Sequence, residues 1–132
     1  KRISLLPAII FKPLHLDGLV LRLDYLFDLR FPELFRHLAL QGAQLISARL
    51  NWPEARGDIV ALLAQARAAE NHTFVVAVNC AGSFKGALFY GHSMVVAPVA
   101  KFLLKQVCRR RLFPAKSIWQ MLRKYAAGLM LA

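Results

Sequence analysis

The sequence predicts an α/β domain, and three observations point to this class. Apolar runs rich in leucine, isoleucine and valine alternate with segments whose apolar residues recur every three or four positions, so strands alternate with helices. The 132 residues are enough for one domain with a core of its own and too few for two of ordinary size. The predicted order is β, α, β, α, β, β, which places the helices on one face of a sheet.

The first predicted unit is a strand followed by a helix. GLVLRLDYLF, residues 18–27, is a leucine-rich run typical of a buried strand. Pro32 stands where a helix can begin, Leu34 and Leu38 then share one helical face, and Gly42 ends the helix.

The second predicted unit repeats this pattern. AQLISA, residues 43–48, is the next strand, and the following helix runs over residues 58–71 with Asp58 as its N-cap. The residues predicted to share the buried face of this helix are Ile59, Leu62, Leu63 and Ala66.

The remaining elements are two strands and two helices. TFVVAVN (73–79) and HSMVVAP (92–98) are predicted strands, and CAGSFKG between them is a turn-rich connection. Beyond Pro98, residues 99–113 and 116–132 are both predicted to be helices, because their apolar residues recur at helical spacing opposite basic ones.

The charge distribution changes near Pro98. The net charge is +11, yet residues 1–98 hold ten basic and seven acidic residues, while residues 99–132 hold eight basic residues and no acid. We therefore predict a division into residues 1–98 and a basic amphipathic helical tail, 99–132. Such a tail can bind an anionic membrane surface or another acidic partner, or it can be a solvated or disordered charged face. No motif indicates a specific nucleic-acid partner.

The cysteines and histidines indicate the redox compartment of the protein and whether it has a metal site. Cys80 and Cys108 are too few for the disulfide framework of a small secreted domain, which favours a reducing cytoplasm. The four histidines show no metal-ligand spacing with one another or with the cysteines: His15, His37, His72 and His92. We therefore expect no metal site and no cofactor.

Four strings follow one another along the chain: DLRFPELFRHLALQGAQLI, NWPEARGD, LLAQARAAENHTFVVAVN and GHSMVVAP. In this order they resemble the carbon-nitrogen hydrolases, the nitrilase superfamily, and especially their ω-amidase-like members. The resemblance covers roughly residues 18–98 and corresponds to the C-terminal half of the family. It implies an αββα sandwich, of which this chain holds a part, and the hydrolysis of small linear non-peptide amides or nitriles through a Glu, Lys and Cys triad.

The nucleophile is missing from the position that the resemblance assigns to it. The family's cysteine stands two residues before the aspartate of the Asp-Leu-Arg-Phe-Pro-Glu string, and counting back from Asp28 gives Leu26. A leucine has no lone pair with which to form an acyl-enzyme. Because loss of a triad nucleophile lowers turnover by on the order of 10⁶, we expect little or no amidase activity.

The other triad members are also in question. The family's general-base glutamate lies in a half that this sequence does not contain, and no acidic residue precedes Asp17. FKPLHLDG resembles the segment with the catalytic lysine, which makes Lys12 its counterpart. Lys12 stands much closer to Leu26 than the family's lysine stands to its cysteine, so a solvated lysine is the other interpretation.

Three residues are candidates for substrate binding. In family members that bind carboxylate-bearing substrates, arginines near the nucleophile hold the carboxylate, which makes Arg30 a candidate. The alternative is a salt bridge from Arg30 to Asp28 or Glu33. The resemblance places Asn51 and Trp52 at the rim of the pocket, and Trp52 also fits a packing role.

Further departures point to a decayed, frameshifted or recombined gene. The family usually has proline where Arg49 stands, a His-Trp pair where Ile59 and Val60 stand, and aspartate where Ala97 stands. The sequence therefore predicts a truncated amidase-like hydrolase that has lost its activity. The alternative is a non-catalytic module for oligomerisation or for binding membranes and acidic partners.

Self-association is a further expectation. The apolar fraction of 58% exceeds the roughly 45–50% of ordinary soluble domains. A sheet that lacks the second sheet of its sandwich would leave an apolar face open, and open faces of this kind mark interfaces.

Overall fold

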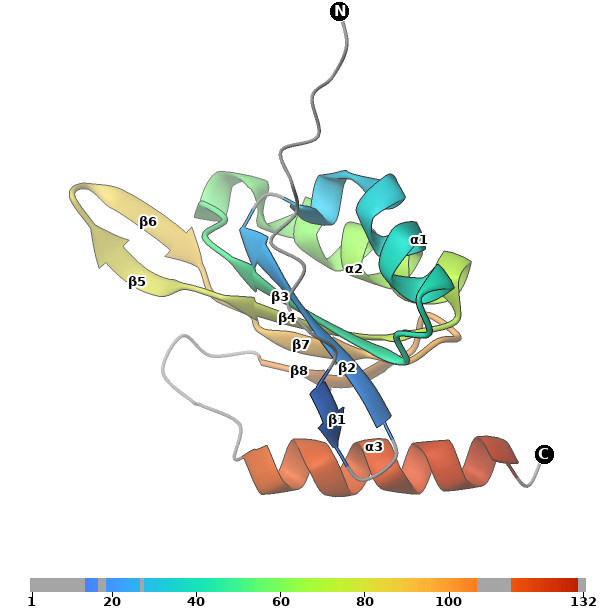
Figure 1. The fold of residues 1–132 in the computed structure, drawn as a ribbon. Helices are drawn as coiled ribbons and strands as arrows, with labels where there is room; N and C mark the ends of the chain where they lie inside the picture. Colours follow the sequence, from blue (N-terminus) through green and yellow to red (C-terminus); the bar gives the residue numbers. More distant parts are fainter. Residues whose placement is uncertain (1–13, 17–18, 27, 107–114, 131–132) are drawn as a thin grey trace, which may run out of the picture.

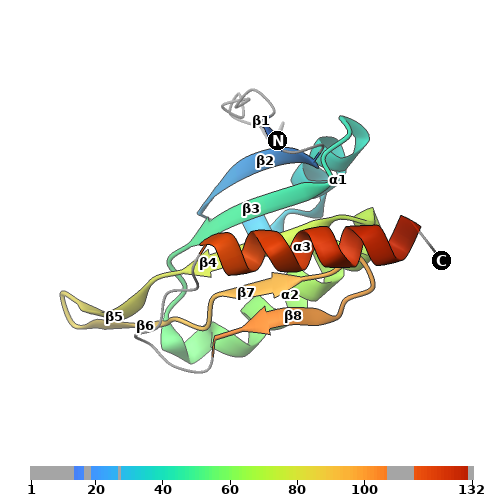
Figure 2. The ribbon, with the colours of Figure 1, turned by 90° about the horizontal axis from the view of Figure 1, so that it is seen from below.

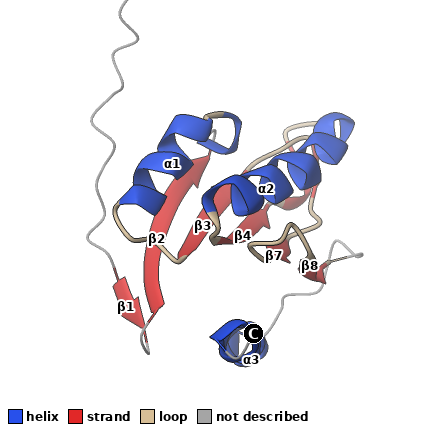
Figure 3. Ribbon diagram, turned by 90° about the vertical axis from the view of Figure 1, so that its right-hand side faces the viewer, coloured by secondary structure: helices blue, strands red, loops and turns tan. Residues whose placement is uncertain are grey.

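The fold is a layered α/β unit with helices on both faces of one main sheet (Figure 1). The computed structural model of this chain describes residues 14–16, 19–26, 28–106 and 115–130. The predicted α/β class is confirmed. The two helices of the first 98 residues cover one face of the sheet, as predicted, and a third helix lies on the other (Figure 3).

Among the described residues, six strands form the main sheet in the order β1-β2-β3-β4-β7-β8. The central strands β2, β3 and β4 run parallel, while β1, β7 and β8 pair antiparallel at the two sides. The bounds are Leu14–Leu16 for β1, Leu19–Leu26 for β2, Leu45–Leu50 for β3, Phe74–Asn79 for β4, Met94–Val96 for β7 and Phe102–Lys105 for β8. The four strands predicted within residues 18–98 are confirmed, and β1 is an addition to them.

Side chains of the central strands alternate between the two faces, because a β-strand has a side-chain period of two. In β4, Val75 and Ala77 belong to the core under the first two helices, while Phe74 and Val76 belong to a second cluster on the opposite face. Leu45 of β3 joins that second cluster. Both faces are therefore apolar, as expected of parallel strands that are covered on two sides.

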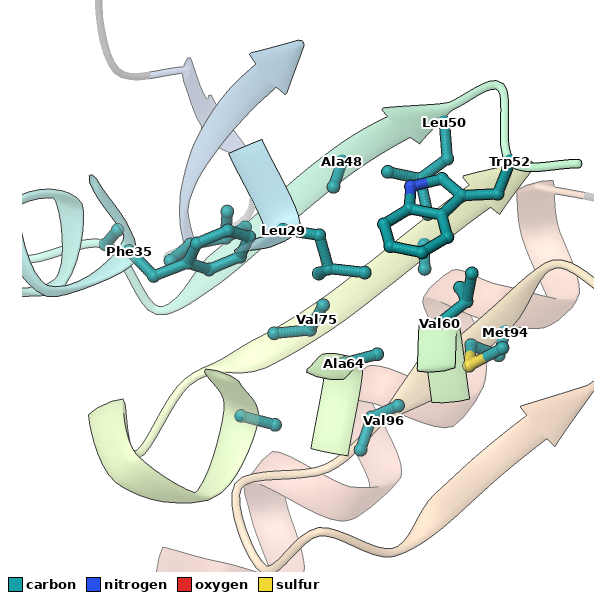
Figure 4. Close-up of a cluster of buried hydrophobic side chains, with 14 residues drawn as sticks. Leu29, Phe35, Ala48, Leu50, Trp52, Val60, Ala64, Val75, Met94 and Val96 are labelled. Atoms are coloured by element: carbon teal, nitrogen blue, oxygen red, sulfur yellow. The ribbon is translucent and has the colours of Figure 1, made fainter. Parts of the chain in front are cut away.

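Two helices cover the first face. The first, α1, spans Pro32–Leu40, and the second, α2, spans Gly57–Asn71. Their side chains and those of the sheet form the main core (Figure 4). Its largest members are Leu29, Phe35, Ile46, Leu50, Trp52, Val60, Val75, Met94 and Val96. The predicted α1 is confirmed, although its most buried residue is Phe35, which was not assigned to its apolar face.

The buried face of α2 differs from the predicted one. Ile59 and Leu62, predicted to face the sheet, are 40% and 67% exposed, whereas Val60, Ala64 and Ala68 are fully buried. Small side chains let the helix axis approach the sheet closely, so this helix places its smallest residues inward. The prediction is confirmed for Leu63, which packs against the main core. It was wrong for Ile59 and Leu62, because large aliphatic residues were assumed to mark the core.

The start of α2 also corrects the sequence prediction. Its N-cap is Arg56, which makes no side-chain cap hydrogen bond, so the prediction that Asp58 caps the helix is wrong. Gly57 lies directly against the ring of Tyr90, and a Cβ built on this glycine would overlap the ring. The helix therefore begins at the one residue type that allows this contact.

The predicted turn-rich connection is a β-hairpin. β5 spans Ala81–Phe84 and β6 spans Ala87–Tyr90, and the two strands pair antiparallel. Lys85 and Gly86 join them with φ values of 47° and 79°, the geometry that tight hairpins require. The hairpin projects from the body of the fold (Figure 1). It was missed because residues 80–86 contain no β-branched residue.

The first helix predicted beyond Pro98 is wrong where the structure describes it. Phe102–Lys105 is the edge strand β8, and Leu104 pairs with Val95 of β7. A short apolar run satisfies strand and helix periods equally, and the free edge of β7 supplies the hydrogen bonds of a strand. The remainder of that predicted helix, 107–113, lies outside the described residues.

The second helix predicted there is confirmed in its described part. α3 spans Ala115–Met130 and lies on the face opposite α1 and α2 (Figure 3). Seen from that side, it crosses in front of β4, between β3 and β7 (Figure 2). Leu122 of α3 is 2% exposed and packs in the second cluster with Phe74 and Val95. The division of the chain at residue 98 stays a prediction, because adjacency in the fold does not decide whether a segment folds alone.

Candidate functional site

The three parallel strands end in register at one edge of the sheet. Leu26 of β2 pairs with Leu50 of β3, which pairs with Asn79 of β4. The segments that follow these strands therefore meet at the same edge, which is where open α/β sheets present functional groups. Leu26, which the resemblance aligns with the nucleophile of the family, is the last residue of β2 at this edge.

Arg30 and Trp52 bring together the segments that follow β2 and β3. The Arg30 guanidinium carbon lies 4.6 Å from the centroid of the Trp52 ring. Trp52 is 4% exposed, so its ring forms a fixed surface, while Arg30 is exposed. Where side chains are described, no ion pair joins Arg30 to Glu33. A guanidinium stacked on an indole keeps its in-plane N–H donors available for an anion.

Asn79 ties the loops of this edge to the end of β4. Its side-chain Oδ1 accepts a hydrogen bond from the Trp52 backbone N–H at 2.8 Å, and its Nδ2 donates to the Gly91 carbonyl at 3.0 Å. Its backbone N–H donates to Ser93 Oγ at 3.1 Å. The side chain is 7% exposed, so these bonds form away from water. Asn79 therefore holds the backbone of Trp52 and, through it, the platform under Arg30.

Asn51 and Cys80 lie side by side at the exposed rim. The Cys80 thiol donates to Asn51 Oδ1 at 2.6 Å, and both residues are exposed. Cys80 follows β4 directly, and β4 is two strands away from β2 in the sheet. With a strand spacing of about 4.8 Å, Cys80 lies roughly 10 Å from residue 26. The Cys80 thiol therefore belongs to a different strand end from residue 26.

Arg67 fixes the turn that follows β2. This turn is the 3-10 helix η1, Asp28–Arg30, and Arg67 Nε donates to the Leu29 carbonyl at 3.0 Å. Arg67 also pairs with Glu70 at 2.8 Å and is 6% exposed. Asn71 Nδ2 donates to the Arg67 carbonyl at 3.0 Å. A buried arginine on α2 thus positions the backbone that carries Arg30.

Sequence reasoning missed the roles of Asn79 and Arg67. The available signals were an asparagine at the end of a predicted strand and one arginine among the small residues of ARAAEN. Lys12 lies outside the described residues, so its assignment stays a prediction. The structure describes the backbone of Leu26 at the end of β2. It brings Arg30, Asn51 and Trp52 together at the edge of the sheet where the parallel strands end.

The described part of the chain contains neither a metal-binding cluster of the kind considered above nor a membrane-spanning helix. No group of three or more His, Cys, Asp and Glu residues there could hold a metal ion. None of the described helices is both long and apolar enough to cross a bilayer.

The family model for carbon-nitrogen hydrolases matches residues 11–107. This chain belongs to the carbon-nitrogen hydrolase family. The match extends beyond the predicted limits of 18 and 98 and includes β8. The resemblance seen in the sequence is therefore confirmed.

Two of the relatives that this chain resembles are amidases. The 2-oxoglutaramate amidase of Bacillus subtilis (strain 168) is 39% identical over 89 residues, which cover 67% of this chain and 34% of the relative. The deaminated glutathione amidase of Dictyostelium discoideum is 38% identical over 85 residues, covering 63% of this chain and 29% of the relative. This hydrolase chain thus spans about a third of the length of these relatives.

A solved amidase of the nitrilase superfamily has the same fold over this region. The amidase from Nesterenkonia sp. AN1 superposes with a TM-score of 0.68 at 32% identity, over 72% of this chain and 36% of that chain. In this structure, which is of a Glu-to-Gln mutant of that amidase, the acetamide moiety of fluoroacetamide is added covalently at the active-site cysteine. The partial nitrilase-like α/β fold predicted for this chain is confirmed.

Proposed function

We propose that this chain is an amidase-like carbon-nitrogen hydrolase that binds a small linear amide and does not cleave it by the cysteine route. The observation that carries the proposal is Leu26 at the end of β2, in register with the strand ends that carry Trp52 and Asn79. The amidase relatives support the substrate class. The strand-end edge retains its polar groups although the nucleophile is absent.

The chemistry follows from the residues present. Amide hydrolysis by this family's route needs a thiolate that attacks the carbonyl carbon, while a base carries the proton to the leaving ammonia. Leucine at position 26 prevents formation of the thioester, so the bound amide stays intact. Arg30 supplies a cation for a substrate carboxylate, Asn51 supplies a polar rim, and Trp52 supports Arg30. Lys12 is proposed as the cation that faces the amide oxygen.

Restoring the nucleophile tests this proposal. In a background with Cys80→Ser and Cys108→Ser, we expect Leu26→Cys to react stoichiometrically with fluoroacetamide, because a thiol then stands at the end of β2. The sulfur–carbon bond forms as fluoride leaves, and intact-protein mass spectrometry detects the added acetamide group. Ammonia release from 2-oxoglutaramate is measured in parallel and is expected to exceed that of the unmodified chain.

The control is Ser83→Cys in the same background, which places a thiol on β5, away from the strand-end edge. It is expected to remain unmodified under the conditions that label Leu26→Cys. Equal labelling of the two variants would contradict a site at residue 26. Ammonia release by the chain that retains Leu26 would contradict the proposed inactivity.

The alternative function is a non-catalytic module that binds anionic membranes or acidic partners. The outer side of α3 favours it, because Lys116, Arg123 and Lys124 are exposed there and no acidic residue follows Glu70. The inner side of α3 packs on the sheet, so membrane binding in this arrangement is electrostatic. The cytoplasmic location and self-association stay predictions, although α3 covers the sheet face that was expected to be open for self-association.

A further inference from the structure

The face of the sheet under α3 is an apolar surface built from four strands. Its buried members are Leu45 of β3, Phe74 of β4, and Val95 and Ala97 in and after β7. Val76, Leu103 and Leu104 extend it as partly buried residues. An exposed apolar face on this scale normally marks an interface or leads to aggregation.

One side of α3 matches this face. Ile118, Trp119 and Leu122 lie at helical spacing along one stripe, and all three pack in the cluster of the sheet face. The residues described as exposed on α3 are Lys116, Gln120, Arg123, Lys124 and Ala127. The helix therefore replaces an apolar surface with a polar, cationic one.

Apolar contact holds α3 in place, because Ile118, Trp119 and Leu122 pack in the cluster of the sheet face. Residues 99–132 contain no acid, so the cations of α3 have no acidic partner within this segment. Attachment by apolar burial does not weaken when salt screens charges. The cations on the outer side of α3, on a chain of net charge +11, repel a second copy of the chain.

The covered region is separate from the candidate site. Leu45 and Phe74 are the first residues of β3 and β4, whereas the site lies where these strands end. On the same face near the strand ends, Val78 remains 45% exposed. Release of α3 therefore exposes the sheet without removing a residue of the site.

The small apolar side chain of Ala97 fits a sheet face that is covered by a helix. It is fully buried in the cluster that contains Leu122, and the resemblance implies an aspartate at this position. A carboxylate there would be buried under the helix with a large desolvation cost. The alanine thus suits a sheet face that is covered by a helix.

We propose that α3 is an intramolecular cover that keeps the sheet face from pairing with a second copy of this chain. With α3 docked, the chain is a monomer at micromolar concentration. With α3 released, the exposed faces of two copies pack together.

Leu122→Asp in the full-length chain tests the proposal, because it places a charge at the most buried contact of α3. We expect sedimentation velocity to show a monomer for the unmodified chain and a dimer or larger species for Leu122→Asp, with a share that rises with concentration. Ala127→Asp is the matched control, since Ala127 is exposed on the same helix. It is expected to remain monomeric.

Tryptophan quenching by acrylamide reports whether α3 leaves the sheet. Trp52 is 4% exposed and stays protected in the folded core, so a rise in quenching reports Trp119. We expect greater quenching in Leu122→Asp than in Ala127→Asp, with far-UV circular dichroism retained. If Leu122→Asp loses its fold, Leu122→Ala is used instead, and partial, concentration-dependent association is the expected result.

Three results would overturn the proposal. The first is a variant with quenched Trp119 that stays monomeric at every concentration. The second is an unmodified chain that dimerises while Trp119 stays protected. The third is release of α3 at about 1 M salt, where the screening length falls to about 3 Å, because charges would then hold the helix.

Discussion

At the residue scale, the edge where the parallel strands end holds a cation in a defined position. Arg30 lies over the ring of Trp52, and Asn79 accepts a hydrogen bond from the Trp52 backbone N–H. Leu26 ends the neighbouring strand and provides no reactive group. The arrangement is suited to binding a substrate carboxylate, which makes Arg30 the residue whose removal is most informative.

Arg30→Gln is expected to weaken binding of an ω-amide that carries a carboxylate by about tenfold, because one charge-assisted contact is lost. Butyramide, which has no carboxylate, is expected to bind both forms equally. Isothermal titration calorimetry measures both affinities. Lys85→Gln, which removes an exposed cation stacked on Phe84 of the hairpin, is the control. Equal losses for the two ligands would exclude a carboxylate contact.

At the element scale, α2 connects the core to the turn after β2. Small residues bring this helix close to the sheet, and Arg67 uses that approach to reach the Leu29 carbonyl. The bond to Glu70 satisfies a second donor of the same guanidinium. Without Arg67, the Leu29 carbonyl loses this partner and Glu70 loses its cation.

Arg67→Ala is therefore expected to lower the free energy of unfolding by about 1–3 kcal/mol. Arg56→Ala, which removes an exposed arginine at the start of the same helix, is expected to change it by less than about 0.5 kcal/mol. Urea unfolding followed by circular dichroism gives both values. Similar losses in the two variants would show that the Leu29 contact contributes nothing to stability.

At the scale of the whole molecule, the chain combines part of a hydrolase fold with a basic helix on its second face. The helix presents cations outward, and its apolar side is occupied by the sheet. Any attraction to an anionic surface is therefore electrostatic and sensitive to salt. This distinguishes the alternative function from insertion of the helix into a bilayer.

If the alternative function holds, the chain sediments with vesicles that contain phosphatidylserine at low salt and is released at about 1 M salt, where charges are screened. Replacing Arg123 and Lys124 together by Gln is expected to weaken this binding about tenfold or more. Arg36→Gln, on α1 across the sheet, is the control and is expected to change it less. Binding that survives high salt would contradict an electrostatic contact.

Much of the fold followed from local pattern. The strand at residues 73–79 and the helix within 116–132 were predictable because their periods are clear over many residues. The hairpin β5–β6 and the strand β8 were not, because their runs are short and the free edge and turn geometry decide their state. The family resemblance named Asn51 and Trp52 as candidate residues. The contacts of Asn79 and Arg67 could not be predicted in this way, because they join segments that are far apart in the chain.

The sequence by itself determined the family, the α/β class and the absence of a cysteine at position 26, since ordered strings and residue identities carry this information. Only the tertiary structure decided which face of α2 is buried and what covers the second face of the sheet. Both features depend on how closely a helix approaches the sheet. The spacing of apolar residues along one segment carries no information about its distance from another segment. The cover by α3 is therefore a property of the packed molecule.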